Sequence, residues 1–339
     1  MPIHEPTKRS RDGAPTARPM ESLFLGEQGV VLGSRPLGQV EAPEDVLLRI
    51  QAAGLCRTDL YVAAGELQAT PGVILGHEAA GIVEAVGSSV NESRVPLGAL
   101  VGIDPRVPCG QCAACRVPAT RTPDACLSPR QLGVEVDGVF AEFTVVPAAC
   151  LYPIEARVSP LRAAYLEPVA AAMGALSAGL SPTDNGVIAG EGRIAELTAR
   201  VLEYAGLPRP RILPTDAFAA AIESGTLDFV IDASLSSDDA LTVMAEALRK
   251  GGTLVMKSRA TRRCSFIPAQ WVAREITVAA RSYGRFADAA RAVADPALVL
   301  EDLFGSARSL SEFEEVFREA RTGEGVKQFF RVAGAVQGH

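Results

Sequence analysis

Three residues with metal-binding side chains lie in separate segments of the first half of the chain. Cys56 opens Cys56-Arg57-Thr58-Asp59, His77 follows Gly76, and Glu167 lies between Leu166 and Pro168. Thiolate, imidazole and carboxylate are ligands that zinc takes, and a catalytic zinc keeps only three protein ligands so that water or substrate can occupy the fourth position. His77 is the only one of the three histidines that lies away from the chain termini. These residues predict an open, catalytic zinc site.

Four of the seven cysteines fall within 18 residues, at Cys109, Cys112, Cys115 and, after ten intervening residues, Cys126. Four thiolates close the tetrahedral shell of zinc and leave no open position, so this lobe predicts a structural zinc. A pair of disulfides is the alternative, but disulfides need an oxidising compartment and usually staple much smaller domains. The sequence therefore predicts two zinc ions per chain, one catalytic and one structural.

The length of the chain indicates how many domains it forms, and its charge indicates which partners it binds. A chain of 339 residues with 48% hydrophobic and 22% charged residues exceeds the size of one hydrophobic core, so two domains are expected. The formal charge of −7 argues against nucleic-acid binding, because the only basic cluster is Lys8-Arg9-Ser10-Arg11. Small molecules are the expected partners.

Residues 1–19 carry Pro, Arg, Ser and Gly without apolar periodicity and predict a disordered N-terminal extension. They lack the apolar stretch of a secretory signal, and no apolar run in the chain approaches a membrane span. We therefore expect a cytoplasmic protein with no membrane contact. A transit peptide is the alternative, although the leader contains Glu5 and Asp12 besides its arginines.

The chain changes character near residue 185. Residues 20–153 read as short β segments separated by Gly and Pro, such as Val46-Leu47-Leu48-Arg49-Ile50 and Val73-Ile74-Leu75. Strands then alternate with helical stretches near 193–205 and 238–250, which is typical of an α/β fold with a parallel sheet. The predicted strands of this sheet are 186–189, 211–213, 229–232, 253–256 and 276–279.

A glycine turn follows the first of these strands, in Gly190-Glu191-Gly192-Arg193-Ile194-Ala195. A Gly-x-Gly-x-x-Gly/Ala turn that opens a helix lets backbone N–H groups approach the pyrophosphate of a dinucleotide. Gly190, Gly192, Arg193 and Ile194 are therefore predicted to bind the cofactor. Glu191 would repel the pyrophosphate unless its side chain turned to solvent, and Arg193 could offset that charge.

The acidic residue expected to hold the adenosine ribose is matched by Asp216. Pro214 should end the preceding strand, because proline cannot donate to a central ladder. Asp216 favours NAD over NADP, whereas Arg209 or Arg211 at the ribose would admit the 2′-phosphate of NADP.

Together these residues resemble the zinc-containing medium-chain alcohol dehydrogenases, in order from about Met20 to Val332. Further matching pieces are Gly81 and Gly87, Gly138-Val139-Phe140-Ala141-Glu142-Phe143, Gly251-Gly252-Thr253 and Arg281-Ser282-Tyr283-Gly284. The resemblance implies a GroES-like catalytic domain over 20–153 and 285–339, with the zinc lobe at 105–130. It also implies a Rossmann dinucleotide-binding domain over 154–284, and assembly as a homodimer or homotetramer.

The resemblance further implies the chemistry. Zinc would polarise an alcohol oxygen while hydride passes to the nicotinamide, and Thr58 would receive the alcohol proton. Tyr61 matches a histidine relay position and is expected only to pack. The metal shell is either Cys56, His77 and Glu167, or Cys56, His77 and Glu78 with Glu167 reaching the metal through water.

Glutamate at position 167 resembles the polyol and threonine dehydrogenase branch, so a small polar polyol, amino alcohol or sugar-like alcohol is the expected substrate. Lys257 and Arg259 could meet an anionic substrate or cofactor phosphates, but solvated loop charges are the preferred interpretation. Two alternatives stay open. One is an NADPH-dependent double-bond reductase on the same fold, and the other is a non-catalytic, cofactor-sensing relative.

Overall fold

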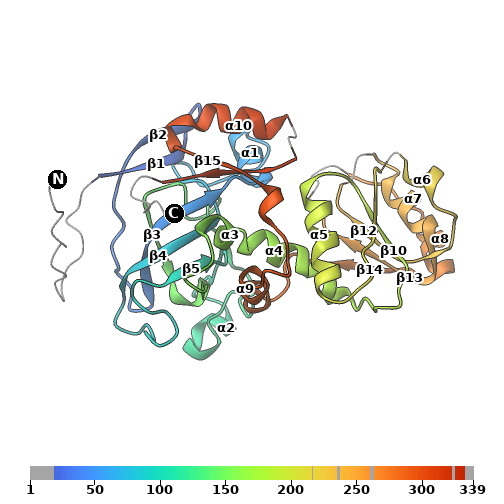
Figure 1. The fold of residues 1–339 in the computed structure, drawn as a ribbon, viewed down its shortest axis with the longest axis horizontal. Helices are drawn as coiled ribbons and strands as arrows, with labels where there is room; N and C mark the ends of the chain where they lie inside the picture. The colour runs from blue at the N-terminus through green and yellow to red at the C-terminus, as the bar shows by residue number, and fades with distance from the viewer. Residues whose placement is uncertain (1–18, 216, 235–236, 260–262, 323–324, 333–339) are drawn as a thin grey trace.

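The computed structural model describes residues 19–215, 217–234, 237–259, 263–322 and 325–332. They form two bodies, one rich in β-strands and one holding a parallel sheet flanked by helices, with helix α4 (Leu166–Met173) between them (Figure 1). The predicted disordered leader lies outside the described residues except for Pro19, which begins a strand. None of the described helices is long and apolar enough to cross a membrane.

The first body is built on a seven-stranded sheet. Its order is β15-β16-β3-β4-β5-β9, with β8 paired to β3. The strands are β3 (Asp45–Gly54), β4 (Glu78–Val86), β5 (Leu100–Ile103), β8 (Phe143–Pro147), β9 (Leu151–Pro153), β15 (Phe304–Arg308) and β16 (Lys327–Phe330). The end of the chain thus returns to the first sheet, where Phe330 of β16 stands opposite Ala53 of β3.

Two hairpins complete this body. Strands β1 (Pro19–Gly26) and β2 (Gly29–Pro36) pair antiparallel, as do β6 (Arg106–Val107) and β7 (Arg130–Gln131). The predicted β segment 73–75 is not a strand. It makes one isolated bridge, between Ile74 and Phe24. The backbones of Val73 and Leu75 form hydrogen bonds with those of Leu25 and Leu23 in β1.

The second body holds five parallel strands in the order β11-β10-β12-β13-β14. They are β10 (Gly186–Ala189), β11 (Arg211–Leu213), β12 (Leu227–Asp232), β13 (Leu248–Met256) and β14 (Thr277–Ala280), so all five predicted strands are present. β11 ends before Pro214, as expected. The helix predicted over 238–250 ends early, because Leu248 is fully buried and pairs with Leu227 in the sheet.

The helices cover both bodies and the junction. They are α1 (Arg57–Ala63), α2 (Ala113–Arg116), α3 (Pro160–Ala164), α4, α5 (Arg193–Tyr204), α6 (Phe218–Ala221), α7 (Ala240–Ala247), α8 (Pro268–Arg274), α9 (Phe286–Ala294) and α10 (Phe313–Arg321). Short 3₁₀ turns lie at Pro118–Thr120, Ala148–Cys150, Gly174–Ala178, Glu301–Leu303 and Leu310–Glu312.

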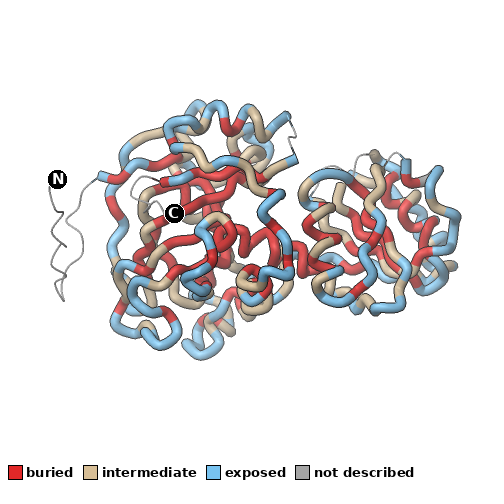
Figure 2. The backbone as a smooth tube through the Cα atoms, viewed as in Figure 1, coloured by how far each residue is buried: buried red, intermediate tan, exposed pale blue. Residues whose placement is uncertain are grey.

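One apolar core crosses the junction. Leu166 and Val169 of α4 pack in the same buried cluster as Leu197 of α5 and Phe286 of α9. Buried residues accordingly run through both bodies and along α4 (Figure 2). Because α4 carries Glu167 within this core, the position of that carboxylate is fixed by packing.

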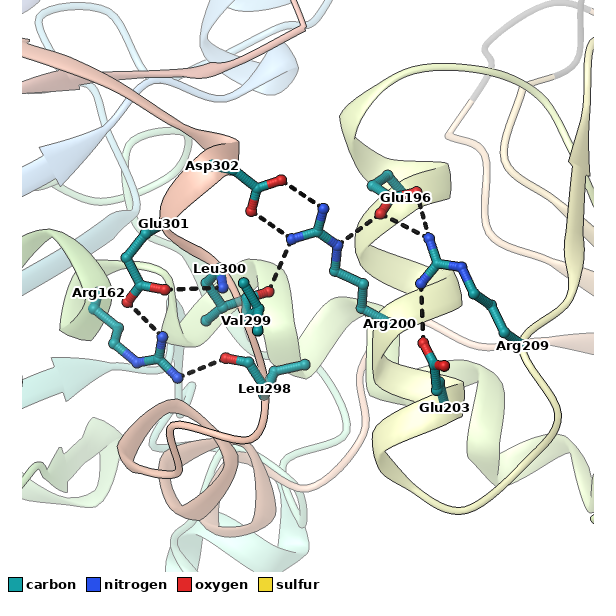
Figure 3. Close-up of polar contacts among 10 residues, drawn as sticks. All are labelled: Arg162, Glu196, Arg200, Glu203, Arg209, Leu298, Val299, Leu300, Glu301 and Asp302. Atoms are coloured by element: carbon teal, nitrogen blue, oxygen red, sulfur yellow. Dashed lines mark hydrogen bonds and ion pairs between the residues drawn. The ribbon is translucent and has the colours of Figure 1, made fainter.

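Charged side chains also join the two bodies. Arg200 of α5 donates to both carboxylate oxygens of Asp302 at 2.6 Å and to the carbonyl of Val299 at 3.0 Å (Figure 3). The same guanidinium donates to Glu196 at 2.6 Å. The bidentate geometry fixes the orientation of α5 against the segment 298–302.

Candidate metal and cofactor site

Cys56, His77 and Glu78 meet where the interior strands β3 and β4 of the first sheet end and begin. Each offers one ligand atom, and these atoms lie within 4.8 Å of one another. Cys56 precedes the first turn of α1, while Glu78 begins β4 opposite Gly54 at the end of β3. Antiparallel pairing of β3 with β4 therefore brings together two segments that are about 20 residues apart in the sequence.

Asp59 holds the two metal-binding segments in register. Its Oδ2 accepts from the backbone N–H of Cys56 at 2.8 Å, and its Oδ1 accepts from the N–H of Gly76 at 3.2 Å. Nδ1 of His77 lies 3.6 Å from Oδ1 of Asp59. A carboxylate behind a histidine ligand fixes the ring orientation and raises the basicity of the ligand.

The imidazole of His77 fits a metal ion. The side chain is fully buried, and neither ring nitrogen has a hydrogen-bond partner within the described residues. Burial lowers the pKa of His77, but the charges of Cys56 and Asp59 outweigh it and raise this pKa well above its usual range. Since buried polar atoms are normally satisfied, the unpartnered nitrogens beside a thiol and a carboxylate indicate a cation site.

Glu78 has a cationic partner on the other side. Lys327 of β16 forms an ion pair with Oε2 of Glu78, and both side chains are almost fully buried. Gly54 makes room for this pair, because a Cβ there would lie 2.6 Å from Cε of Lys327 and 2.9 Å from Oε2 of Glu78. The pair anchors one carboxylate oxygen beside the metal-binding residues.

Glu167 is not among the atoms that cluster with Cys56. It lies in the first turn of α4, is 5% exposed, and its Oε1 accepts from the hydroxyl of Tyr283 at 2.6 Å. Burial raises the pKa of Tyr283 well above its usual range, and so does the charge of Glu167, so the phenol remains a donor at neutral pH. Of the two predicted ligand sets, the structure brings together the one with Glu78.

The four predicted structural ligands do converge. The Sγ atoms of Cys109, Cys112, Cys115 and Cys126 all lie within 4.8 Å of one another. Backbone N–H groups point at the sulfurs, with Cys109 donating to Cys126 at 3.3 Å and Cys112 donating to Cys109 at 3.4 Å. Such N–H groups lower the pKa of Cys112 to about 6, whereas burial raises that of Cys115 to about 12. The lobe is thus a closed four-thiol site suited to zinc.

Arg106 links the cysteine lobe to Tyr283. Its guanidinium donates to Asp104 at 3.0 and 2.7 Å and to Asp124 at 2.7 Å. It also stacks 5.0 Å from the ring centroid of Tyr283, the residue that donates to Glu167. Of the two cysteines outside the metal groups, Cys150 is buried and donates to the carbonyl of Arg106, whereas Cys264 is only partly buried.

The glycine turn has the shape that a pyrophosphate requires. Gly190 and Gly192 have φ values of +138° and +84°, and Gly192 caps α5. A Cβ at Gly192 would meet nothing within 4 Å, so space is open beside the free N–H groups of α5. Glu191 is exposed and Ile194 is 38% exposed.

Arg193 does not offset the charge of Glu191 but donates to the carbonyl of Val326 at 3.0 Å, which links α5 to the first body. Asp216, the expected ribose ligand, lies outside the described residues. Arg209 donates to both oxygens of Glu196 at 2.8 Å and to Glu203 at 3.1 Å, so it is held on α5.

Comparisons with known proteins agree with this geometry. Residues 42–156 match the model of the alcohol dehydrogenase GroES-like domain. D-xylulose reductase A of Aspergillus oryzae is 25% identical over 358 residues, covering 93% of this chain and 98% of the relative. The predicted resemblance to the zinc-containing medium-chain alcohol dehydrogenases is therefore confirmed.

Solved structures of the family share the whole fold. A candidate zinc-binding dehydrogenase of Sinorhizobium meliloti 1021, bound to NADP, superposes with a TM-score of 0.80 at 25% identity, covering 93% of this chain and 99% of that one. A short chain alcohol dehydrogenase of Escherichia coli CFT073, in complex with NADH, gives 0.77 at 20% identity, with 92% and 99% covered. The expected combination of a GroES-like body with a Rossmann sheet is confirmed.

The sequence interpretation missed three residues that contact the proposed metal ligands or Glu167. Asp59 stood within the quoted Cys56 segment and Tyr283 within the quoted segment 281–284, but neither received a chemical role. Lys327 gave no local signal, because 249 residues separate it from Glu78 in the sequence. Only the return of β16 to β3 brings the two together.

Proposed function

We propose that the protein is an NAD-dependent zinc dehydrogenase that oxidises the CH–OH group of a small polar polyol or sugar-like alcohol. The observation that carries the proposal is the buried cluster of Cys56, His77 and Glu78, with three ligand atoms within 4.8 Å and unpartnered imidazole nitrogens. Three protein ligands leave a fourth position for an alcohol oxygen, which is the signature of catalytic zinc.

A zinc ion held there would supply Lewis-acid chemistry, which lowers the pKa of an alcohol. Cys56, His77 and Glu78 are the proposed ligands, and Asp59 orients His77. Thr58 is the proposed first acceptor of the alcohol proton. Its hydroxyl lies 3.8 Å from Sγ of Cys56, on the first turn of α1. Tyr61 lies on the same helix and is proposed only to pack.

Glu167 and Tyr283 supply the polar wall that a substrate with several hydroxyl groups needs. Oε1 of Glu167 is engaged by Tyr283 at 2.6 Å, so its second oxygen is the one proposed to accept from substrate or from a metal-bound water. A buried carboxylate that loses its hydrogen-bond donors is costly, so an alcohol without further hydroxyls is expected to be a poor substrate.

NAD is the proposed cofactor, held at Gly190, Gly192 and the start of α5. Arg209 is committed to Glu196 and Glu203. Arg211 begins β11 and therefore lies at the end of the strand opposite to the ribose site. Neither arginine is thus placed for a 2′-phosphate, which NADP binding uses.

The experiment is a fluorescence titration of the purified protein with NADH and with NADPH, followed by assays of xylitol and D-sorbitol oxidation. Tighter NADH binding, polyol turnover and its loss in Cys56→Ser are expected, together with two zinc ions per wild-type chain. Cys264→Ser is the control, since Cys264 belongs to neither zinc group. If neither nucleotide binds to the protein at millimolar concentration, the proposal is contradicted.

A further inference from the structure

Two cationic side chains follow the carboxyl end of β13 and are anchored on the segment that leads out of β14. The ammonium group of Lys257 donates to the carbonyls of Arg281 at 2.7 Å and Ser282 at 2.8 Å. Arg259 donates to Oγ of Ser282 at 3.3 Å, and its guanidinium carbon lies 5.4 Å from the ring centroid of Tyr283. Lys257 is thus anchored and partly buried instead of being a solvated loop charge, whereas Arg259 is exposed.

Arg259 faces the metal and alcohol site. The ring on which it stacks belongs to Tyr283, whose hydroxyl is bound to Glu167. Interactions with Tyr283, first, and with Glu167 and Cys56 raise the pKa of Arg259, although burial opposes them, in agreement with this placement. The cation therefore stands on the wall of the proposed catalytic site.

The guanidinium of Arg259 has N–H groups that are free to bind a ligand. In the described part of the chain, Arg259 makes no ion pair with a carboxylate, and the residue is exposed to solvent. The nearby carboxylate of Glu167 is occupied by Tyr283. A planar guanidinium with free N–H groups suits a carboxylate or a phosphate, which it can bind with two parallel hydrogen bonds.

The sheet order separates these cations from the cofactor's own phosphates. The glycine turn follows β10, and the adenosine ribose belongs at the end of β11, whereas Lys257 and Arg259 follow β13. β12 lies between β10 and β13, so the turn and the cations are two strand spacings apart, about 10 Å. An anion at Arg259 therefore lies on the alcohol side of the site.

We propose that the alcohol substrate carries an anionic group, a carboxylate or a phosphate monoester, which Arg259 binds while Lys257 adds positive charge. This inference rests on the proposed dehydrogenase function and narrows its substrate class from neutral polyols to acidic ones. Arg259 determines specificity in this scheme and takes no part in hydride or proton transfer.

The test compares D-sorbitol with D-gluconate and D-sorbitol 6-phosphate, using wild type, Arg259→Met and Arg259→Lys. Arg249→Met is the matched control, because Arg249 lies at the opposite end of β13 and pairs with Asp228 on the surface. At least one acidic alcohol is expected to exceed sorbitol in kcat/KM, and the preferred one distinguishes carboxylate from phosphate. Arg259→Met should lower kcat/KM for the acidic alcohol by about 10- to 100-fold and lower kcat/KM for sorbitol by much less.

Arg259→Lys should recover part of that loss, since it keeps the charge but not the fork. Equal use of sorbitol and the acidic alcohols, or equal loss on both in Arg259→Met, would overturn the proposal. Equal loss would instead assign Arg259 to positioning Tyr283.

Calorimetric titration with inorganic phosphate and with malonate gives a readout that does not need turnover. Binding to the wild type is expected with and without NADH, and its loss in Arg259→Met but not in Arg249→Met. Anion binding that persists in Arg259→Met, or that NADH displaces, overturns the proposal. Failure to bind either nicotinamide nucleotide overturns the proposed dehydrogenase instead, and the anion titration of the free protein then still tests Arg259.

Discussion

The hydroxyl of Tyr283 donates to Oε1 of Glu167 at 2.6 Å, which joins the segment after β14 to the first turn of α4. The two residues are 116 positions apart in the sequence, Glu167 on the junction helix α4 and Tyr283 just after the last strand of the parallel sheet. The contact therefore holds the carboxylate of Glu167 in place and couples α4 to the parallel sheet.

Tyr283→Phe removes this donor and is expected to lower kcat/KM for the best polyol by about 10-fold, because a charge-assisted hydrogen bond contributes roughly 1.5–3 kcal/mol. Zinc content should stay at two ions per chain, since Glu167 is not among the clustered ligands. Tyr152→Phe is the control, as Tyr152 packs against the same Phe286 ring at 5.7 Å. Loss of zinc in Tyr283→Phe would show that Glu167 ligates the metal directly.

Lys327→Met leaves the buried carboxylate of Glu78 without its cation. Breaking a buried ion pair from one side costs about 3–5 kcal/mol, so we expect the metal-free variant to lose that much free energy of unfolding in urea. Bound zinc supplies a replacement charge, and the loss should be smaller in the zinc-loaded protein. Lys250→Met, which breaks an exposed pair with Glu275, should cost at most about 1 kcal/mol. Equal costs for the two variants would contradict the buried pairing.

Asp59→Asn is expected to weaken the catalytic zinc and spare the structural one. The amide cannot accept from both backbone N–H groups and still offer a charge to His77, and loss of such a supporting carboxylate typically costs about 10- to 100-fold in metal affinity. Zinc per chain after dialysis against a mild chelator should fall from two towards one. Asp45→Asn changes an acceptor for the N–H of Ala42 and should retain both ions. A loss confined to the cysteine lobe would refute this role.

Lys257 should make stability depend on alkaline pH. Burial, first, and the charge of Arg259 together lower its pKa to about 8, while Glu167 opposes them. The unfolded chain, where the ordinary value is 10.5, then binds more protons between pH 8 and 10.5, so the free energy of unfolding rises with pH in that window. Because Lys257 is partly exposed, the gain over Lys257→Met between pH 7.5 and 9.5 is discounted to about 1 kcal/mol.

Urea unfolding of wild type and Lys257→Met at the two pH values measures this difference. Lys250→Met, at an exposed ammonium, should show the same pH dependence as wild type. A difference between wild type and Lys257→Met that stays constant or shrinks with rising pH would mean that the folded protein does not disfavour the charged amine.

The sequence by itself determined the metal chemistry and the class of fold. Cysteine spacing in the lobe is local, so the closed thiolate site followed from 18 residues alone. The five strands of the parallel sheet were equally readable, because each is a short apolar run bounded by turn residues. The positive φ values of Gly190 and Gly192 could be predicted because glycine adopts such a conformation readily.

Only the tertiary structure decided which carboxylate stands with Cys56 and His77. Glu78 and Glu167 carry identical chemistry, and the pairing of β3 with β4, against the packing of α4, places one in the cluster and the other under Tyr283. Likewise the charges of Lys257 and Arg259 followed from the sequence, but the position of these side chains in the fold did not. Loop conformation at the end of a strand depends on long-range contacts, here with residues 281–283, that no local pattern encodes.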